Sequence, residues 1–241
     1  MQRRSFTTTV GTIALAGAVT LTGCSSTDVK KPNASSSSIS PVQRLEAVKK
    51  VVDTAAGLHL EVTSAQVPSS VSGLLSGSGD GSHAPAFKGD LTVQIAGASA
   101  KVPVVALDGK VYAKLPIAPV FTVVDPSTFG APDPAVLFST GPDGLTSLLP
   151  KTQAAKLGAQ QRNGAETVDV ISGTLPSSAI RKVLGFGKDA TGLNYDVEYQ
   201  VSATNELRQV KMTGPFFQAG GKTSYVLALT KYGTKVNVTK P

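Results

Sequence analysis

Residues 58–63 (Leu-His-Leu-Glu-Val-Thr) alternate apolar and polar side chains without a break. This two-residue period is typical of a β-strand with one buried face and one solvated face. The segment just before it, 42–56, has a different period, because its apolar residues recur every three or four positions with charged residues between them. That spacing predicts an amphipathic α-helix, which we expect Gly57 to end. A helix should therefore lead directly into a half-buried strand.

The same alternation returns along the rest of the chain. It is found at residues 91–95, 102–104, 111–113, 168–170, 195–201, 210–212, 225–229 and 236–238. Turn signals such as Asp108-Gly109 and Asn163-Gly164 separate these segments. Because short turns join antiparallel neighbours, whereas parallel strands need long crossovers, the pattern predicts a meandering antiparallel sheet with one apolar face.

Three short helical segments interrupt the strands. They are predicted at 135–138 after the cap and proline Asp133-Pro134, at 144–149, and at 179–184 after a cap at Ser177 or Ser178. Since they are too short to build a core of their own, we expect them to cover the apolar face of the sheet. The fold class is therefore predicted to be α+β.

Two tracts rich in Gly, Ser and Pro, 67–85 and 115–132, are predicted to be loops. The second carries Phe121, Val123 and Val124 and is more apolar than a solvated loop requires. It is either a packed loop or the cover of a cavity mouth.

The chain begins with the pattern of a secretory signal: Arg3 and Arg4, a mostly apolar run over 6–20, and small residues before a cysteine. The apolar run is too short for a membrane-spanning helix. Residues 21–24 (Leu-Thr-Gly-Cys) resemble a bacterial lipobox, in which Cys24 takes a diacylglyceryl group before the leader is cut. We therefore expect a signal peptide at 1–23, a lipidated Cys24 with a flexible Ser-rich tether at 24–40, and one domain at 41–241.

Lipidation would anchor the protein to the cell membrane on its extracytoplasmic side. The alternative is that Cys24 is an ordinary buried thiol. Since it is the only cysteine, no disulfide can form within the chain. A flexible tether of this length has a mean reach of roughly 20–25 Å, which would keep the domain close to the lipid headgroups.

The net charge of +7 falls to about +5 when residues 1–23, with two of the 23 basic groups and none of the 16 acidic ones, are removed. In an exported chain this favours anionic headgroups over nucleic acid as a partner, although scattered basic residues also fit an ordinary solvated surface. Neither His59 nor His83 has a His or Cys at ligand spacing, and no G-x-S-x-G sequence occurs. We expect no enzymatic activity, no metal and no cofactor.

With this layout in view, the chain resembles the actinobacterial cell-envelope lipoproteins of the LppX, LprA, LprF and LprG family over roughly 42–241. The resemblance is carried, in order, by 57–62 (Gly-Leu-His-Leu-Glu-Val), 88–93 (Lys-Gly-Asp-Leu-Thr-Val), 105–112 (Val-Ala-Leu-Asp-Gly-Lys-Val-Tyr), 133–137 (Asp-Pro-Ala-Val-Leu) followed by Gly144-Leu145, and the ending that starts with 229–233 (Leu-Thr-Lys-Tyr-Gly).

The resemblance implies a strongly curved antiparallel sheet, a half-barrel similar to the LolA and LolB carriers, with helices on its concave face around an apolar cavity. It also implies that the cavity holds acyl chains of lipids or lipoglycans, which the protein carries from the inner membrane toward the outer envelope. The implied partners are the membrane, through Cys24, an acylated lipid and a membrane lipid exporter, and the protein would act as a monomer without nucleic acid.

The expected cavity lining is Leu60, Val62, Leu91, Val93, Ile95, Val104, Val111, Val170, Val197 and Val210 from the strands, and Val136, Leu137, Leu145, Leu148, Leu149, Ile180, Val183 and Leu184 from the helices. Each of these residues could instead belong to a filled core. In that case the protein would be a surface lipoprotein that binds or scaffolds another envelope protein.

Overall fold

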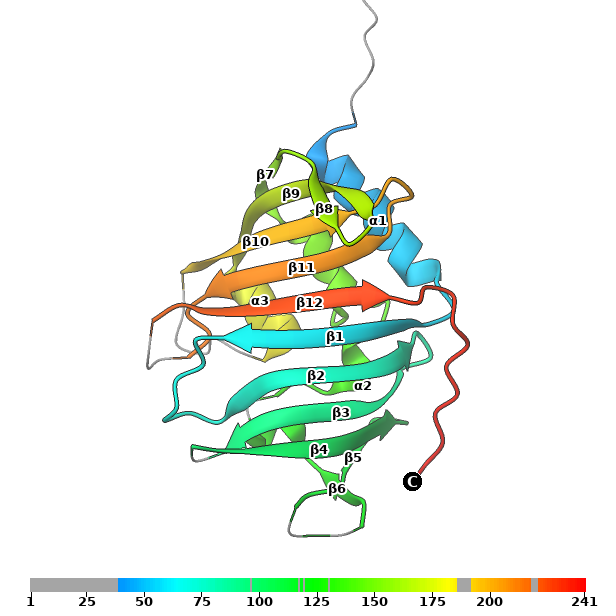
Figure 1. The fold of residues 1–241 in the computed structure, drawn as a ribbon, viewed down its shortest axis with the longest axis vertical. Coiled ribbons are helices and arrows are strands. Elements are labelled where there is room, and N and C mark those ends of the chain that lie inside the picture. The colour runs from blue at the N-terminus through cyan, green and yellow to red at the C-terminus, as the bar shows by residue number, and fades with distance from the viewer. Residues whose placement is uncertain are drawn as a thin grey trace, which may run out of the picture. The chain divides into compact units, whose positions relative to one another are not determined.

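An open, curved antiparallel sheet of twelve strands dominates the part of the chain that the structure describes (Figure 1). The structure is a computed structural model that describes residues 39–95, 97–116, 118, 120–129, 131–185, 192–217 and 221–241. The expected leader, Cys24 and nearly all of the expected tether lie outside these residues. Residues 39–241 form a compact unit that carries its own hydrophobic core.

The strands are β1 (Leu58–Ala65), β2 (Gly73–Ser82), β3 (Ala86–Ile95), β4 (Ala98–Leu107), β5 (Lys110–Ala113), β6 (Thr122–Val124), β7 (Gln153–Leu157), β8 (Gln161–Asn163), β9 (Glu166–Pro176), β10 (Asn194–Val201), β11 (Leu207–Gly214) and β12 (Thr223–Thr230). Their order across the sheet is β6-β5-β4-β3-β2-β1-β12-β11-β10-β9-β7, with β8 also paired to β9. The predicted meander is confirmed, and its first and last strands meet at the centre of the sheet, where His59 is opposite Thr230.

The predicted N-terminal helix is α1 (Pro41–Thr54). Ser40 caps it: the Gln43 backbone N–H donates to Ser40 Oγ, and Gln43 Oε1 accepts from the Ser40 backbone N–H, which is a capping box. The helix ends before Gly57, so glycine is not its stop signal. A side chain at Gly57 would instead lie 2.7 Å from the carbonyl oxygen of Thr234, and glycine is needed there because the C-terminal segment passes close by.

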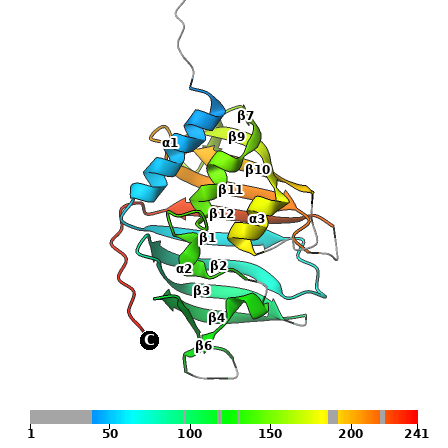
Figure 2. The same ribbon diagram turned by 180° about the vertical axis from the view of Figure 1, so that it is seen from behind.

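The helices all lie against one face of the sheet (Figure 2). Besides α1 they are the 3₁₀ helix η1 (Pro126–Phe129), α2 (Pro134–Leu137), the 3₁₀ helix η2 (Leu145–Lys151) and α3 (Ser177–Leu184). Asp133 caps α2 as expected, since Ala135 N–H donates to its carboxylate at 2.8 Å. The predicted serine cap of α3 is wrong, because Pro176 occupies the cap position and both serines lie inside the helix.

The tract 67–85 is not a loop as predicted, because it contains the central strand β2. Alternate positions of β2 are Gly77, Gly79 and Gly81, which leave no apolar side chains for a periodicity to detect. The glycines are required by packing, since a Cβ at Gly79 would lie 2.5 Å from the Phe87 ring. The predicted loop 115–132 likewise contains β6 and η1.

The strand predicted at 236–238 is also wrong. Residues 231–241 contain no strand and run as an irregular segment past the ends of the strands next to β12 (Figure 1). Lys240 Nζ lies 5.9 Å from the centre of the Tyr112 ring, which holds the end of the segment near β5 through a cation–π contact. The alternating residues Val236 and Val238 therefore lie in this irregular segment, which we call the strap (residues 231–241), and not in a paired strand.

Candidate functional site

The strand register assigns each side chain to one of the two sheet faces, because opposed residues point to the same side. Leu60 is opposite Leu229 and Gly79, Gly79 is opposite Gly89, and Gly89 is opposite Val104. This row marks the face that the helices cover, which we call the inner face. The other face is the outer face.

One apolar pocket, pocket A, lies on the inner face beneath α1 and η2. Its cavity volume is about 30 Å³. Its lining is Val52, Leu58, Leu60, His83, Leu137, Phe138, Leu145, Thr146, Leu148, Leu149, Leu175, Tyr199, Leu207, Val210, Met212 and Leu229. Apart from His83, Thr146 and the Tyr199 hydroxyl, these side chains offer no hydrogen-bonding groups, so pocket A suits an apolar ligand.

A second apolar pocket, pocket B, lies over β3, β4 and β5. Its cavity volume is about 60 Å³. Its lining is Leu91, Val93, Ile95, Val102, Val104, Val111, Ala113, Leu115, Val124, Pro126, Ala131, Pro132 and Pro134. The segment 115–132 supplies several of these residues, so it does cover a pocket, which was one of the two interpretations of its apolar character.

Two aromatic rings lie between the pockets. Phe87 and Phe138 are stacked, with ring centres 5.9 Å apart and planes 28° from parallel. The Phe87 ring covers Gly79 and the Phe138 ring covers Gly81, because a Cβ at either glycine would lie within 2.5 Å of the ring. We call these two side chains the aromatic wall, which occupies the space that the glycines of β2 leave free.

Histidine 83 ties the wall to α1. Its Nδ1 lies 2.5 Å from the Phe138 carbonyl oxygen and its Nε2 lies 2.8 Å from the Val52 carbonyl oxygen. Both partners are acceptors, and a neutral imidazole has a single N–H, so only the protonated ring can donate to both at once. The residue predicted to lie in a simple loop therefore joins the end of α1 to the end of α2.

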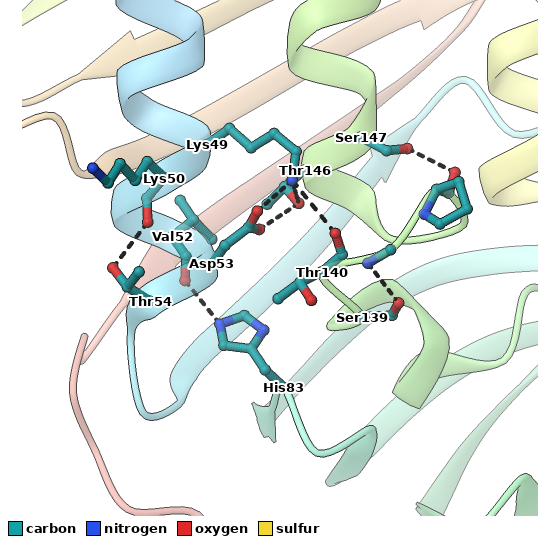
Figure 3. A network of polar contacts seen from close by, with 12 residues as sticks. Lys49, Lys50, Val52, Asp53, Thr54, His83, Ser139, Thr140, Thr146 and Ser147 are labelled. Carbon is teal, nitrogen blue, oxygen red and sulfur yellow. Dashed lines mark hydrogen bonds and ion pairs between the residues drawn. The ribbon is translucent and has the colours of Figure 1, made fainter.

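A polar network closes the edge of pocket A between α1 and η2 (Figure 3). The Asp53 carboxylate accepts from the Thr146 hydroxyl at 2.7 Å and pairs with the Lys49 ammonium group. Lys49 also lies 3.5 Å from the Thr140 carbonyl oxygen. Because the Asp53 side chain is only 18% exposed, the network holds α1 against η2 more firmly than a surface ion pair would.

The predicted cavity residues divide into groups. Pocket A contains Leu60, Leu137, Leu145, Leu148, Leu149 and Val210, and pocket B contains Leu91, Val93, Ile95, Val104 and Val111. Packed in the core outside both linings are Val62, Ile180, Val183, Leu184 and Val197. Val136 is half-buried and lines neither pocket.

Val170 was placed on the wrong face. Its neighbour Ile171 is opposite Tyr199, which lines pocket A, so Val170 points to the outer face. It is buried there, and Gly158 lies close to its side chain, since a Cβ at Gly158 would lie 3.7 Å from the Val170 Cβ. A strand that is apolar on both faces gives no sign of which face is inner.

Sequence reasoning missed the aromatic wall and His83. The sequence predicts Phe138 only as the last residue of a short helix, and Phe87 follows the tract 67–85, which is predicted to be a loop. Contacts across the sheet fix both roles, and no local pattern encodes such contacts.

His59 has polar neighbours on the outer face that the sequence did not indicate. Its Nδ1 lies 2.6 Å from Asp80 Oδ1, and its Nε2 lies 3.1 Å from Ser78 Oγ. The Glu61 carboxylate lies 3.5 Å from the same Nε2 and competes with the hydroxyl for it. At Ser78, β2 is paired with a strand on each side, so its backbone N–H groups are used in hydrogen bonds within the sheet. They are not available to stabilise a negatively charged oxygen of a reaction intermediate, which an enzyme site would require. Within the described ranges, no group of three His, Cys, Asp or Glu side chains could hold a metal ion.

Buried tyrosines make the fold sensitive to alkali. Burial raises the pKa of Tyr199, and its hydrogen bond with Thr152 opposes this in part. Burial also raises the pKa of Tyr225. The unfolded chain therefore loses phenol protons first, from about pH 10, and stability that is complete below that pH falls as the pH rises.

We accordingly expect the urea midpoint to fall steadily between about pH 9.5 and 11. The Tyr199→Phe variant should show a shallower decline, because it removes one of the ionising groups. Urea titrations followed by circular dichroism at several pH values measure both slopes. A midpoint that is constant over this range would contradict the expectation.

Two solved structures share the fold. LprF from Mycobacterium bovis is 14% identical, with 83% of this chain and 96% of that chain covered and a TM-score of 0.66. Lipoprotein LppX from Mycobacterium tuberculosis is 17% identical, with 83% and 98% covered and a TM-score of 0.61. A LolA superfamily protein from Nitrosomonas europaea overlaps less well, with 9% identity, 78% and 90% coverage and a TM-score of 0.28.

Among curated proteins, no sequence matches the chain. None of the helices in its described part combines the length and the apolar character needed to cross a membrane. The family model of the LppX_LprAFG lipoproteins matches residues 40–238, which covers the sheet, its helices and both pockets. The chain therefore belongs to the LppX/LprAFG lipoprotein family.

Proposed function

We propose that this protein is a lipid-anchored envelope lipoprotein that binds acyl chains on the inner face of its sheet. The observation that carries the proposal is the pair of pockets A and B, whose linings are almost entirely apolar. The cavity residues that lie in these two linings are the proposed ligand contacts.

The energetics of acyl-chain burial fit such a site. Each buried methylene contributes about 0.8 kcal/mol, so about ten methylenes would contribute about 8 kcal/mol. That corresponds to a dissociation constant of roughly 1 μM before the costs of ordering the chain. Affinity of this order allows a carrier to load and to release its ligand.

The proposed cellular role follows from the N-terminal sequence. Residues 1–23 would direct export, Cys24 would carry the lipid anchor, and the tether to residue 40 would let the domain 41–241 work on the extracytoplasmic side of the cell membrane. The protein would take its ligand from the inner membrane, with a membrane lipid exporter as a partner, and pass it outward. This role needs no catalytic group.

The test is to purify residues 25–241 without detergent and to record a native mass spectrum, followed by lipid analysis of a solvent extract. We expect phospholipid or glycolipid to co-purify in a stoichiometric amount, and the delipidated protein to reload from envelope lipid extract. A clean apoprotein mass that stays unchanged after this incubation would contradict lipid binding. It would favour a filled core and a role in binding another envelope protein.

A further inference from the structure

We propose that the inner face holds two separate acyl-chain sites, one in pocket A and one in pocket B, and that the ligand is a lipid whose two acyl chains lie on opposite sides of the aromatic wall. The inference rests on the proposed function, because it assumes that the pockets hold acyl chains. It adds the number of chains and the residues that separate them.

The linings of the two pockets have no residue in common. Pocket A takes its strand residues from β1 and from β9 to β12, whereas pocket B takes its own from β3 to β6. The strand between the two groups is β2, whose inner positions 77, 79 and 81 are glycines, while Leu74 near its start also lies on the inner face, opposite Val93. The sheet itself therefore provides two apolar surfaces separated, over most of β2, by glycines.

Neighbouring side chains fill the space over β2. Leu91 covers Gly77, with its Cδ2 2.6 Å from where a Cβ would lie, and the aromatic wall covers Gly79 and Gly81. Phe87 is 3% exposed and Phe138 is 5% exposed, so the wall is packed on both sides. A chain that passed from one pocket to the other over Gly79 or Gly81 would have to displace these rings.

The wall is held in position from the helix side as well. Pro134, at the start of α2, lines pocket B, whereas Leu137 at its end lines pocket A, so this short helix lies across the division. The contact of His83 with the Phe138 carbonyl oxygen fixes the end of α2, and its contact with Val52 fixes that end to α1. The division is thus part of the packed fold and not a single mobile side chain.

Under this proposal each pocket holds one chain of a two-chain lipid. Two chains on one headgroup would bind as a bivalent ligand. We therefore expect a dipalmitoyl phospholipid to bind at least about 100-fold more tightly than palmitic acid.

Stoichiometry tests the proposal directly. Delipidated residues 25–241, which contain the whole compact unit, are titrated with palmitic acid or with dipalmitoyl phosphatidylglycerol and examined by native mass spectrometry. We expect two palmitic acid molecules or one phospholipid per chain. Val210→Phe fills part of pocket A, and Ala113→Phe fills part of pocket B. Each should leave one palmitic acid bound, and circular dichroism checks that each variant folds.

A second measurement follows each pocket separately by fluorescence. The chain has no tryptophan, so a single Leu137→Trp or Val124→Trp substitution reports on pocket A or pocket B alone. Both positions are only partly buried and tolerate a larger side chain better than the core does. Brominated palmitic acid should quench both tryptophans, and Ala113→Phe should remove the quenching at Val124→Trp while leaving that at Leu137→Trp.

The outcomes separate the two proposals. If at most one palmitic acid binds, and either filling variant abolishes it, the inner face holds one continuous site and the two-chain proposal is wrong, although the protein still binds lipid. If neither palmitic acid nor phospholipid binds to the folded wild-type chain, the proposed function itself fails.

Discussion

Gly89→Ala is expected to lower the free energy of unfolding by about 3 kcal/mol, because the added methyl group meets backbone that cannot move aside. A Cβ at Gly89 would lie 2.2 Å from the Ser78 carbonyl oxygen and 2.6 Å from the Gly79 Cα. Both atoms belong to β2, the strand beneath the aromatic wall. Relief of the clash would separate β2 from β3 at the centre of the inner face.

The matched control is Gly158→Ala. A Cβ there would lie 3.5 Å from the Val170 carbonyl oxygen, which is an ordinary contact, and the residue is exposed. We expect a change of less than about 0.5 kcal/mol. Urea unfolding of both variants measures the difference, and equal midpoints would show that β2 and β3 do not approach as closely as described.

Leu45→Ala is expected to cost about 3 kcal/mol, which in a domain of this size would lower the melting temperature by roughly 6–12 °C. Leu45 lies on the buried side of α1 and is fully buried, so its truncation leaves a cavity beneath the helix. Because α1 also forms the roof of pocket A through Val52, the variant should hold a ligand in that pocket less tightly.

Val42→Ala on the same helix is the control for Leu45→Ala. The Val42 side chain is 41% exposed, so the same change to alanine removes little buried surface, and alanine favours the helix. Differential scanning calorimetry should place this variant within about 2 °C of the wild type. If Leu45→Ala and Val42→Ala lowered the melting temperature equally, α1 would not be anchored to the domain through its buried side.

Local sequence patterns were sufficient to predict a helix or a strand wherever one face of the element was apolar and the other was polar. The period change at residue 57 located α1 and β1, and the repeated alternation gave the antiparallel meander. The same reasoning failed at β2, where glycines replace the apolar residues of the inner face. It failed again at residues 236–238, where an alternating pair lies in a strap that no strand pairs with.

The candidate site was predictable only in part, because the sequence shows which residues are apolar but not which of them line a pocket and which are packed against other side chains. Leu60 and Ile180 have similar apolar side chains, yet Leu60 lines pocket A while Ile180 is packed in the core. The position of helices relative to the sheet decides between these outcomes, and periodicity does not contain that information. Residues such as Phe138 and His83 obtain their roles from contacts with distant strands and helices.

The pairing of β1 with β12 has a consequence for how the protein reaches its folded state. Nearly every other pairing in the sheet joins strands that are close in sequence and can form while synthesis is still in progress. The seam between His59 and Thr230 must wait for almost the last residues of the chain, and it closes the longest loop in the fold. Contacts of such high sequence separation form slowly, so the edge of β1 that faces β12 stays unpaired until the chain has fully emerged, whereas its other edge can already pair with β2. During that interval the unpaired edge of β1 is the position at which aggregation, or a chaperone, has its best opportunity to act.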